Sequence, residues 1–193
     1  MIKKAEYLEK LSTFDKNIFG CRIIATAEAY GMNEPFAQFW VQDDKAAILK
    51  LDDTVIINVV KSEETDFSEI HDFIPLTGVS KVLCDLKTAQ KLGFQVEVRG
   101  KIMEYHNDTA IESNPVFKIN PSLRDAYSLL LECKTDNFTP PEFEPFYMDM
   151  SHRIRHSTAV SVGMYQGETL VSGALCSAFT KNCAILSAVA VSP

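Results

Sequence analysis

The chain has 193 residues, enough for one large domain or two small ones with a substantial core. Hydrophobic residues make up 46% and charged residues 23%, as in an ordinary globular protein. The formal charge of -7 argues against bulk nucleic-acid binding, which needs positive charge facing phosphates. No apolar run reaches the length of a membrane span, and the polar start MIKKAEYLEK is unlike a signal peptide. We therefore expect a cytoplasmic protein that binds neither nucleic acid nor membrane.

The first half of the chain alternates helical and strand patterns. Its first thirty residues are predicted to be helical, in two stretches of which the second ends at Gly31, although CRIIATA could also form a strand. Three strands separated by Asp-Asp turns follow, at 36–42, 46–51 and 55–60. Asp66 is the expected N-cap of a short helix with Phe67, Ile70 and Ile74 at helical spacing. The pattern then predicts a strand at 81–86, a helix ending at Gly93 and a long alternating strand at 95–106.

The pattern restarts after a polar stretch, HNDTAIESNP, which we interpret as a linker. This divides the chain into a first lobe at 1–105, a linker at 106–115 and a second lobe at 116–193. The second lobe opens with a strand at 116–119, and Asn120 is the expected N-cap of a helix with Pro121 at its first position. Thr139 and Glu142 are spaced as a capping box for a second helix. Three strands then form a meander, at 158–165, 168–179 and 183–191.

The last strand, AILSAVAV at 184–191, is a continuous apolar run, typical of a strand buried on both faces. Ser192-Pro193 resembles the start of a turn, so we expect a further segment to follow. An unpaired apolar edge without charge or proline pairs readily with another chain. We therefore expect this strand to contact the first lobe or to form a homodimer.

The order strand, two helices and three-stranded meander, from Val116 to Pro193, resembles the first half of the GNAT acyltransferase fold. LSAVAVSP carries the resemblance, since the family commonly has an L-x-x-V-A-V-x-P strand followed by a glycine-rich Q/R-x-x-G-x-G/A loop. The element order of the first lobe is similar to the whole GNAT succession. The resemblance implies an α+β fold with mixed, helix-flanked sheets, built of a degenerate first lobe and the first half of a second, truncated before the phosphate-binding loop.

The resemblance also implies acetyl-CoA as cofactor, with Val189, Ala190 and Val191 on the strand whose backbone binds the pantetheine arm. A plain core strand is the equally weighted alternative for these three residues. In the first lobe, Glu63, Glu64 and Asp66 occupy the place of the phosphate loop, where carboxylates would repel a diphosphate and occupy its donors. We therefore expect no CoA binding there.

Other groups give weaker signals. Five cysteines without a C-x-x-C pair indicate reduced thiols in a cytoplasm rather than disulfides or a zinc site. His152 and His156 have i, i+4 spacing, but no third ligand is evident, so no metal is expected. Tyr165 is expected to be structural, and no catalytic acid or base is assigned.

The function implied by the resemblance is transfer of an acetyl group from acetyl-CoA to an amine of a small molecule or a peptide. Because the phosphate loop is missing, we expect this chain to be inactive. The alternative is a non-catalytic interaction or dimerisation module with the same fold.

Overall fold

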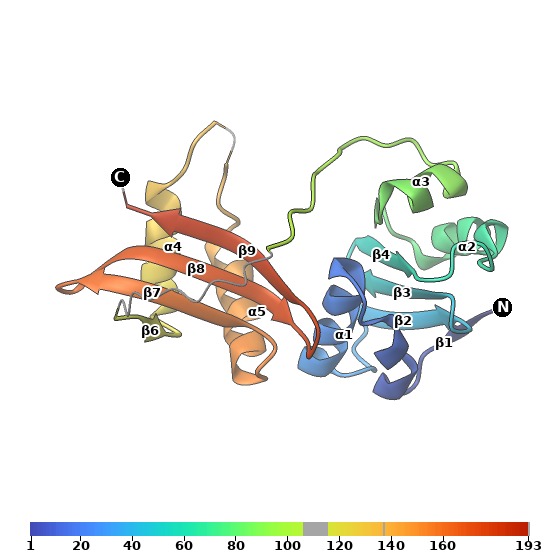
Figure 1. Ribbon diagram of the computed structural model, residues 1–193, viewed down its shortest axis with the longest axis horizontal. Coiled ribbons are helices and arrows are strands. Elements are labelled where there is room, and N and C mark those ends of the chain that lie inside the picture. The colour runs from blue at the N-terminus through green and yellow to red at the C-terminus, as the bar shows by residue number, and fades with distance from the viewer. Residues whose placement is uncertain (106–115, 137, 193) are drawn as a thin grey trace.

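The structure is a computed structural model that describes residues 1–105, 116–136 and 138–192 (Figure 1). Two separate β-sheets with α-helices packed on them confirm the predicted α+β class. The first sheet is built from residues 2–83 and the second from residues 118–191. The predicted linker 106–115 lies outside the described residues. None of the helices in the described ranges is both long and apolar enough to cross a bilayer.

The first sheet has five strands in the order β1-β2-β3-β4-β5. These strands are β1 (Ile2–Lys4), β2 (Ala37–Gln42), β3 (Ala46–Leu51), β4 (Thr54–Val59) and β5 (Lys81–Leu83). Neighbouring strands are antiparallel, except that β5 runs parallel to β4. The three central strands confirm the predicted meander to within one residue at each end. The Asp-Asp turns function as expected, because Asp43 and Asp52 adopt positive φ, which Asp tolerates.

Helices cover both faces of the first sheet. On one face lies α1 (Ile18–Tyr30), and on the other lie α2 (Phe67–Phe73) and α3 (Leu86–Leu92). The alternation along β3 explains the two layers: Ala47 and Leu49 pack on the α1 side, whereas Ala46 and Ile48 pack on the α2 side. Short 3-10 helices complete this part: η1 (Leu8–Lys10), η2 (Ser12–Phe14) and η3 (Ile74–Thr77).

Each of the first three α-helices starts at a side-chain cap. The side chains of Asn17, Asp66 and Asp85 accept hydrogen bonds from the exposed N–H groups of the first turn. Gly31 and Gly93 follow α1 and α3 with positive φ, where a side chain would be strained. The predicted Asp66 cap and both glycine ends are therefore confirmed.

The second sheet has four antiparallel strands in the order β6-β7-β8-β9. They are β6 (Lys118–Ile119), β7 (Val160–Gln166), β8 (Thr169–Phe179) and β9 (Ala184–Val191). Two helices, α4 (Leu123–Glu132) and α5 (Phe143–Arg155), separate β6 from β7 and lie behind the strands in Figure 1. This agrees with the predicted order of strand, two helices and three-stranded meander.

Helix α1 contacts both sheets. Besides its core on the first sheet, it packs Cys21 and Ala25 against Ala178 of β8 and Ile185 of β9. Figure 1 shows α1 between the two sheets, at the hairpin that joins β8 to β9. β9 therefore contacts the first part of the chain, but, contrary to expectation, no strand of the first sheet pairs with its outer edge among the described residues. The contact is made by the face of the strand rather than by its outer edge.

Three predictions in the first part of the chain need correction. The first thirty residues are not all helical: β1 and two 3-10 turns precede α1, and β1 pairs with β2. The predicted strand 81–86 stops at Leu83, because Asp85 caps α3. Residues 94–105, most of the predicted long strand, form neither helix nor strand, and Val98 is 87% exposed. An alternating pattern becomes a strand only where a sheet edge pairs with it.

Both predicted caps in the second part are wrong. Helix α4 is capped by Ser122, whose side chain accepts from the N–H of Asp125, whereas Asn120 has a φ of 49° and accepts from the N–H of Ser161. Helix α5 starts at Phe143, so Thr139 is not its cap. The physical reason is the Pro140-Pro141 pair, because a residue before proline is disfavoured in the helical region. Pro140 therefore cannot continue a helix begun at Thr139.

Candidate functional site

The most distinctive surface of the molecule is the face of the second sheet that points away from its helices, here called the open face. Residues that pair across neighbouring strands point to the same face of the sheet, and the pairing places three rows of side chains on the open face. These residues are Ile119, Val160, Val162, Met164, Ser172, Ala174, Cys176, Leu186, Val189 and Val191. The hydrophobic clusters that contact α1, α4 and α5 use the opposite face, with residues such as Leu175 and Ala190.

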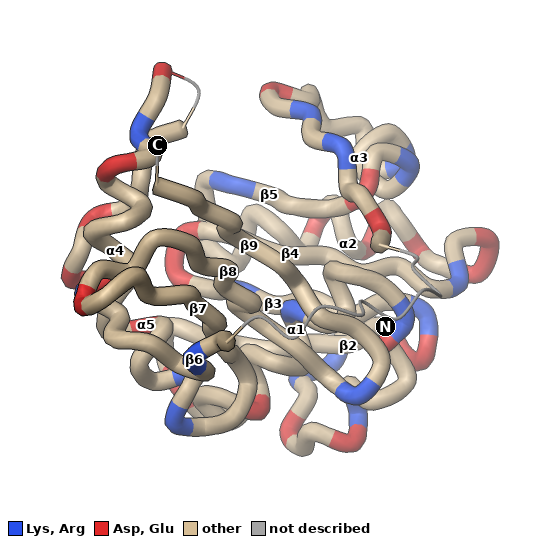
Figure 2. Tube along the Cα trace, turned by 60° about the vertical axis from the view of Figure 1, so that its left-hand side comes forward, with Lys and Arg blue, Asp and Glu red and all other residues tan. Residues whose placement is uncertain are grey.

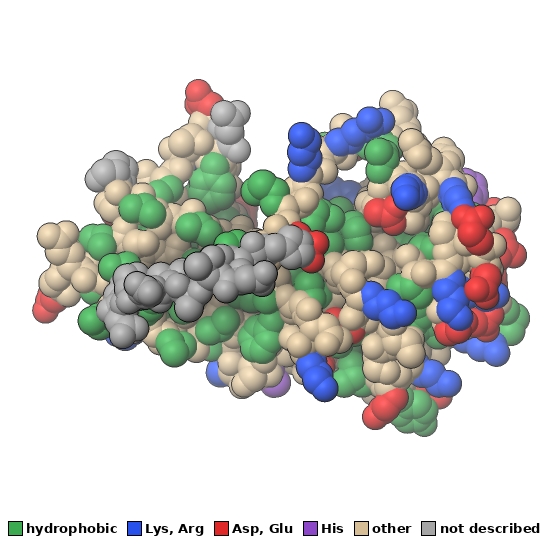
Figure 3. Space-filling view, in the orientation of Figure 1, with side chains coloured by type: hydrophobic (Ala, Val, Ile, Leu, Met, Phe, Trp, Pro, Cys, Tyr) green, Lys and Arg blue, Asp and Glu red, His purple; other side chains and the backbone are tan. Residues whose placement is uncertain are grey.

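The open face is apolar and uncharged. Leu186, Val189 and Val191 are each more than 60% exposed, and Ile119 is 70% exposed. β7, β8 and β9 contain no charged residue, and in Figure 2 their path is tan while charges gather around it. Figure 3 shows hydrophobic side chains over this sheet. Contiguous apolar surface of this kind marks an interaction or ligand-binding site.

The prediction that AILSAVAV is buried on both faces is wrong. Alternate residues behave differently: Ile185 and Ala190 are buried against helices, whereas Leu186 and Val189 are exposed on the open face. A continuous apolar run reports only the absence of polar residues. It does not show that both faces are covered.

β9 is the edge strand of the described part of the sheet, and at its outer edge the carbonyl of Val191 accepts from the Cys133 thiol at 3.4 Å. The N–H of Ser192 donates to the carbonyl of Val171, toward β8. Backbone N–H groups alternate sides along a strand, and the register from Val189 to Val191 is regular. The N–H groups of Val189 and Val191 therefore point away from β8, whereas that of Ala190 points toward it.

The three predicted site residues thus fall on one strand but differ in role. Val189 and Val191 offer both an exposed side chain and an outward backbone donor. Ala190 is 6% exposed and packs against Leu129 and Leu130 of α4, so it holds the strand in place. A role for these residues in binding acetyl-CoA stays a prediction.

In the first sheet, the place expected for the phosphate loop is the end of β4 and the loop before α2, and this place carries acidic side chains. β4 pairs with β5 only from Thr54 to Ile56, so its last three residues separate from β5 and lead to the loop before α2. There the carboxylate of Asp66 accepts from the N–H of Glu69, and the N–H of Asp66 donates to Gln42. Glu63 pairs with Lys91 at 3.1 Å. The start of α2 is therefore occupied by the protein's own groups.

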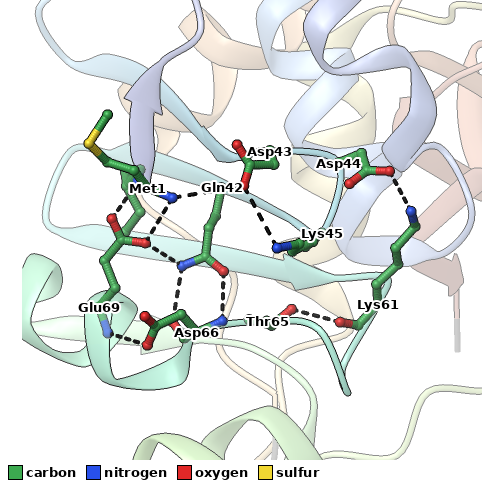
Figure 4. A network of polar contacts seen from close by, with 10 residues as sticks. Met1, Gln42, Asp43, Asp44, Lys45, Lys61, Thr65, Asp66 and Glu69 are labelled. Carbon is green, nitrogen blue, oxygen red and sulfur yellow. Dashed lines mark hydrogen bonds and ion pairs between the residues drawn. The ribbon is translucent and has the colours of Figure 1, made fainter.

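Figure 4 shows the polar contacts that join the start of α2 to the N-terminus and to the end of β2. Gln42 is 1% exposed, and its amide donates to the carbonyl of Asp66 at 3.0 Å and to Glu69 at 2.7 Å. Glu69 also accepts from the N–H of Ile2 at 2.6 Å and lies 3.5 Å from the amino group of Met1. The loop is thus a structural junction between β1, β2 and α2.

The acid-base groups near the second sheet have structural partners. The hydroxyl of Tyr165 donates to Asp125 of α4 at 2.8 Å, and partial burial followed by this bond raises the pKa of Tyr165. His152 contacts the carbonyl of Ala29 at the end of α1 at 2.7 Å, and its ring stacks on those of Tyr30 and His156. None of these groups lies on the open face.

A partly buried polar contact between α1 and α5 was not predicted from the sequence. Tyr30 donates to Asp149 at 2.5 Å, and Arg153, only 5% exposed, donates to the same oxygen at 2.8 Å. Burial and then the bond with Asp149 raise the pKa of Tyr30. The i, i+4 spacing of Asp149 and Arg153 was a usable signal for their pairing, but nothing local indicated the contact with Tyr30.

Comparisons of the chain with protein-family models, with curated proteins and with solved structures each give no match. A functional assignment therefore depends on topology and on the residues themselves.

Proposed function

We propose that the chain is of the GNAT acyltransferase type and that the outer edge of β9 binds the pantetheine arm of acetyl-CoA. The supporting observation is the combination of β6, two helices and the β7-β8-β9 meander, in which β9 has no further strand beside it among the described residues. The first sheet adds support, because its meander is followed by a helix and a strand parallel to β4. In this proposal, residues 1–105 and residues 116–193 are both variants of the GNAT topology.

The backbone of β9 fits such a ligand. Pantetheine contains two amide groups, and an extended chain with amides can pair with a free strand edge as an additional strand would. The outward N–H groups of Val189 and Val191 are the donors for this pairing, and the exposed valine side chains flank the arm.

Acetyl-CoA would supply an activated acetyl group. The acceptor in this proposal is an amine of a small molecule or a peptide. An outward N–H of β9 would stabilise the negative charge that develops on the thioester oxygen when the amine attacks. The start of α2 in the first sheet is less suited to this role, because the N–H groups of Asp66 and Glu69 already donate to the protein's own side chains.

Backbone amide shifts in NMR spectra test the proposal directly. Adding acetyl-CoA to the labelled chain should shift the amides of Val189 and Val191, while those of residues 62–69 stay in place. Adenosine 3′,5′-bisphosphate, which lacks pantetheine, is the ligand control. Val191→Pro removes an outward donor without removing a ladder bond and should weaken the response, whereas Val191→Ala retains the donor. Unchanged β9 amides at saturating acetyl-CoA would refute the proposed site.

A second candidate is an interaction module that dimerises through β9, and the apolar open face is the observation that favours it. Two copies could pair their β9 edges antiparallel, since no charge or proline interrupts residues 184–191. Light scattering on the chain and on Val189→Lys distinguishes this candidate, since the lysine would place a charge on the pairing strand and on the apolar open face. Met148→Lys, at an exposed position of α5, is the matched charge control. A chain that is monomeric at high concentration would exclude dimerisation.

A further inference from the structure

Two cysteines from distant parts of the sequence meet where α1 contacts the β8–β9 hairpin. The Sγ atom of Cys21 lies 3.4 Å from the carbonyl oxygen of Cys183 and 4.0 Å from that of Ala178. Cys21 is fully buried, and Cys183 packs against the same small cluster. The two residues are 162 positions apart in the sequence, so the contact of the Cys21 thiol with the Cys183 backbone links α1 to the second sheet.

The position of Cys183 is fixed by the hairpin around it. The N–H of Thr180 donates to the carbonyl of Cys183 at 2.8 Å, and the N–H of Cys183 donates to the Thr180 hydroxyl at 3.2 Å. That hydroxyl donates to Asp15 at 2.7 Å, and Asn182 donates to the same carboxylate at 3.0 Å. Asp15 directly follows η2, so the hairpin tip is bound to the part of the chain that leads into α1.

The two thiols differ in access to solvent. Cys183 lines a surface hollow beside the hairpin, together with Cys176, Phe179 and Thr180. Cys21 is not among the residues that line this hollow, and it has no exposed surface. The pKa of Cys21 is raised to about 12, first by burial and then by the neighbouring Cys183 thiol. Cys21 is therefore a protonated, protected thiol at neutral pH, and an oxidant reaches Cys183 first.

We propose that Cys183 and Cys21 form a redox-sensitive pair in which a hydroperoxide oxidises Cys183 and Cys21 then closes a disulfide between the hairpin and α1. In the first step the Cys183 sulfur takes one oxygen from the hydroperoxide, whose O–O bond breaks to leave an alcohol or water. In the second step the Cys21 sulfur displaces hydroxide from the Cys183 sulfenic acid. That hydroxide takes the Cys21 proton and leaves as water. The two sulfurs lose two electrons, which the hydroperoxide gains.

Cys176 is the internal competitor for this chemistry. It lines the same hollow, and its pKa is also raised, first by burial. It stands on the open face of β8 and donates to the carbonyl of Ala178 in its own strand at 3.3 Å. Cys21 faces the opposite side of the sheet, in the cluster that contains Cys183. We therefore expect Cys183 to pair with Cys21 and not with Cys176.

Peptide mapping of the full chain tests the pairing. The reduced protein is treated with hydrogen peroxide, remaining thiols are alkylated, and digestion is followed by mass spectrometry. The expected product links the Cys21 peptide to the Cys183 peptide, leaves Cys84, Cys133 and Cys176 alkylated, and is reversed by dithiothreitol. The same link should form in Cys176→Ser. A link between Cys176 and Cys183, or full alkylation of all five cysteines after peroxide treatment that oxidises a control peptide, would overturn the proposal.

Two variants check the order of the steps while leaving the rest of the thiols in place. In Cys21→Ser the sulfenic acid on Cys183 should persist, and dimedone, which traps sulfenic acids, should label Cys183. In Cys183→Ser, Cys21 should remain reduced because it has no access to solvent. The urea midpoint of the wild type should also rise on oxidation, because the disulfide closes a loop of 162 residues. Dimedone on Cys21 in Cys183→Ser would contradict the assigned order.

Discussion

Gly20→Ala is the substitution that most directly tests how α1 is placed between the two sheets. A methyl group at Gly20 would overlap the carbonyl oxygen of Phe14 and lie 2.7 Å from Nδ2 of Asn58. That Nδ2 donates to the same Phe14 oxygen at 2.9 Å, and the other side of the Asn58 amide accepts from Asn17, the N-cap of α1. The methyl group would therefore meet both the backbone and a buried hydrogen-bond network.

The expected loss of stability follows from three contributions. Overlap with backbone atoms costs about 3 kcal/mol, the upper end for overpacking, because the chain must move. Weakening the buried Asn58 bond costs about 1 kcal/mol. Alanine is favoured over glycine within a helix by about 1 kcal/mol, which offsets part of this. The free energy of unfolding should fall by about 3 kcal/mol, a large share of the stability of a small domain.

Urea unfolding followed by circular dichroism measures this change. Gly100→Ala is the matched control, because a methyl group there meets nothing within 4 Å and the residue has no positive φ. The control should stay within about 0.5 kcal/mol of the wild type. A Gly20→Ala protein as stable as the control would show that η2 and α1 do not approach each other as described.

Three further changes test separate contacts. Ser161→Ala should raise the free energy of unfolding by about 1 kcal/mol in urea titrations, because the buried hydroxyl has no hydrogen-bond partner among the described residues; a loss of stability would contradict this. Tyr30→Phe removes the bond to Asp149 and should cost about 1.5 kcal/mol by the same measurement, and an unchanged midpoint would show that α1 and α5 do not depend on it. Hydrogen bonds from Ser80 lower the pKa of Asp53. The ionised carboxylate therefore stabilises the fold at pH values above its ordinary pKa of 3.8, and this stabilisation is lost as the pH falls through the lower pKa of the folded state. Asp53→Asn should therefore reduce the acid dependence of the urea midpoint below pH 3.8. A variant whose urea midpoint depends on pH as that of the wild type does would argue against these hydrogen bonds.

The parts of the fold that the sequence predicts well are those with a local physical cause. Asp66 caps α2 because its carboxylate reaches the N–H three residues later, and Gly93 ends α3 because it tolerates a positive φ. The meander at 37–59 follows from short apolar runs separated by Asp-Asp turns. In each case the residues that decide the structure are neighbours in the chain.

The wrong predictions concern features that depend on contacts between segments far apart in the sequence. Residues 94–105 have the alternation of a strand, but pairing requires a neighbouring edge that no local pattern reveals. The exposure of Val189 depends on whether a helix packs on the open face, and β9 itself carries no information about that. At the candidate site, the sequence therefore predicted a strand at 184–191, but not which of its faces and backbone donors are available.

Helix α1 packs against both sheets and so joins them mechanically. Its composition is unusually small and apolar, with Ala25, Ala27 and Ala29 all less than 5% exposed, so it can pack closely on two sides at once. One side fills the core of the first sheet, and the other meets β8 and β9 at Ala178 and Ile185. Because the same helix is fixed at one end by Asn17 and at the other by contacts with α5, displacing it would disturb both sheets together. The position of β9, and with it the outward donors of the proposed site, is therefore coupled to the core of the first sheet through one helix.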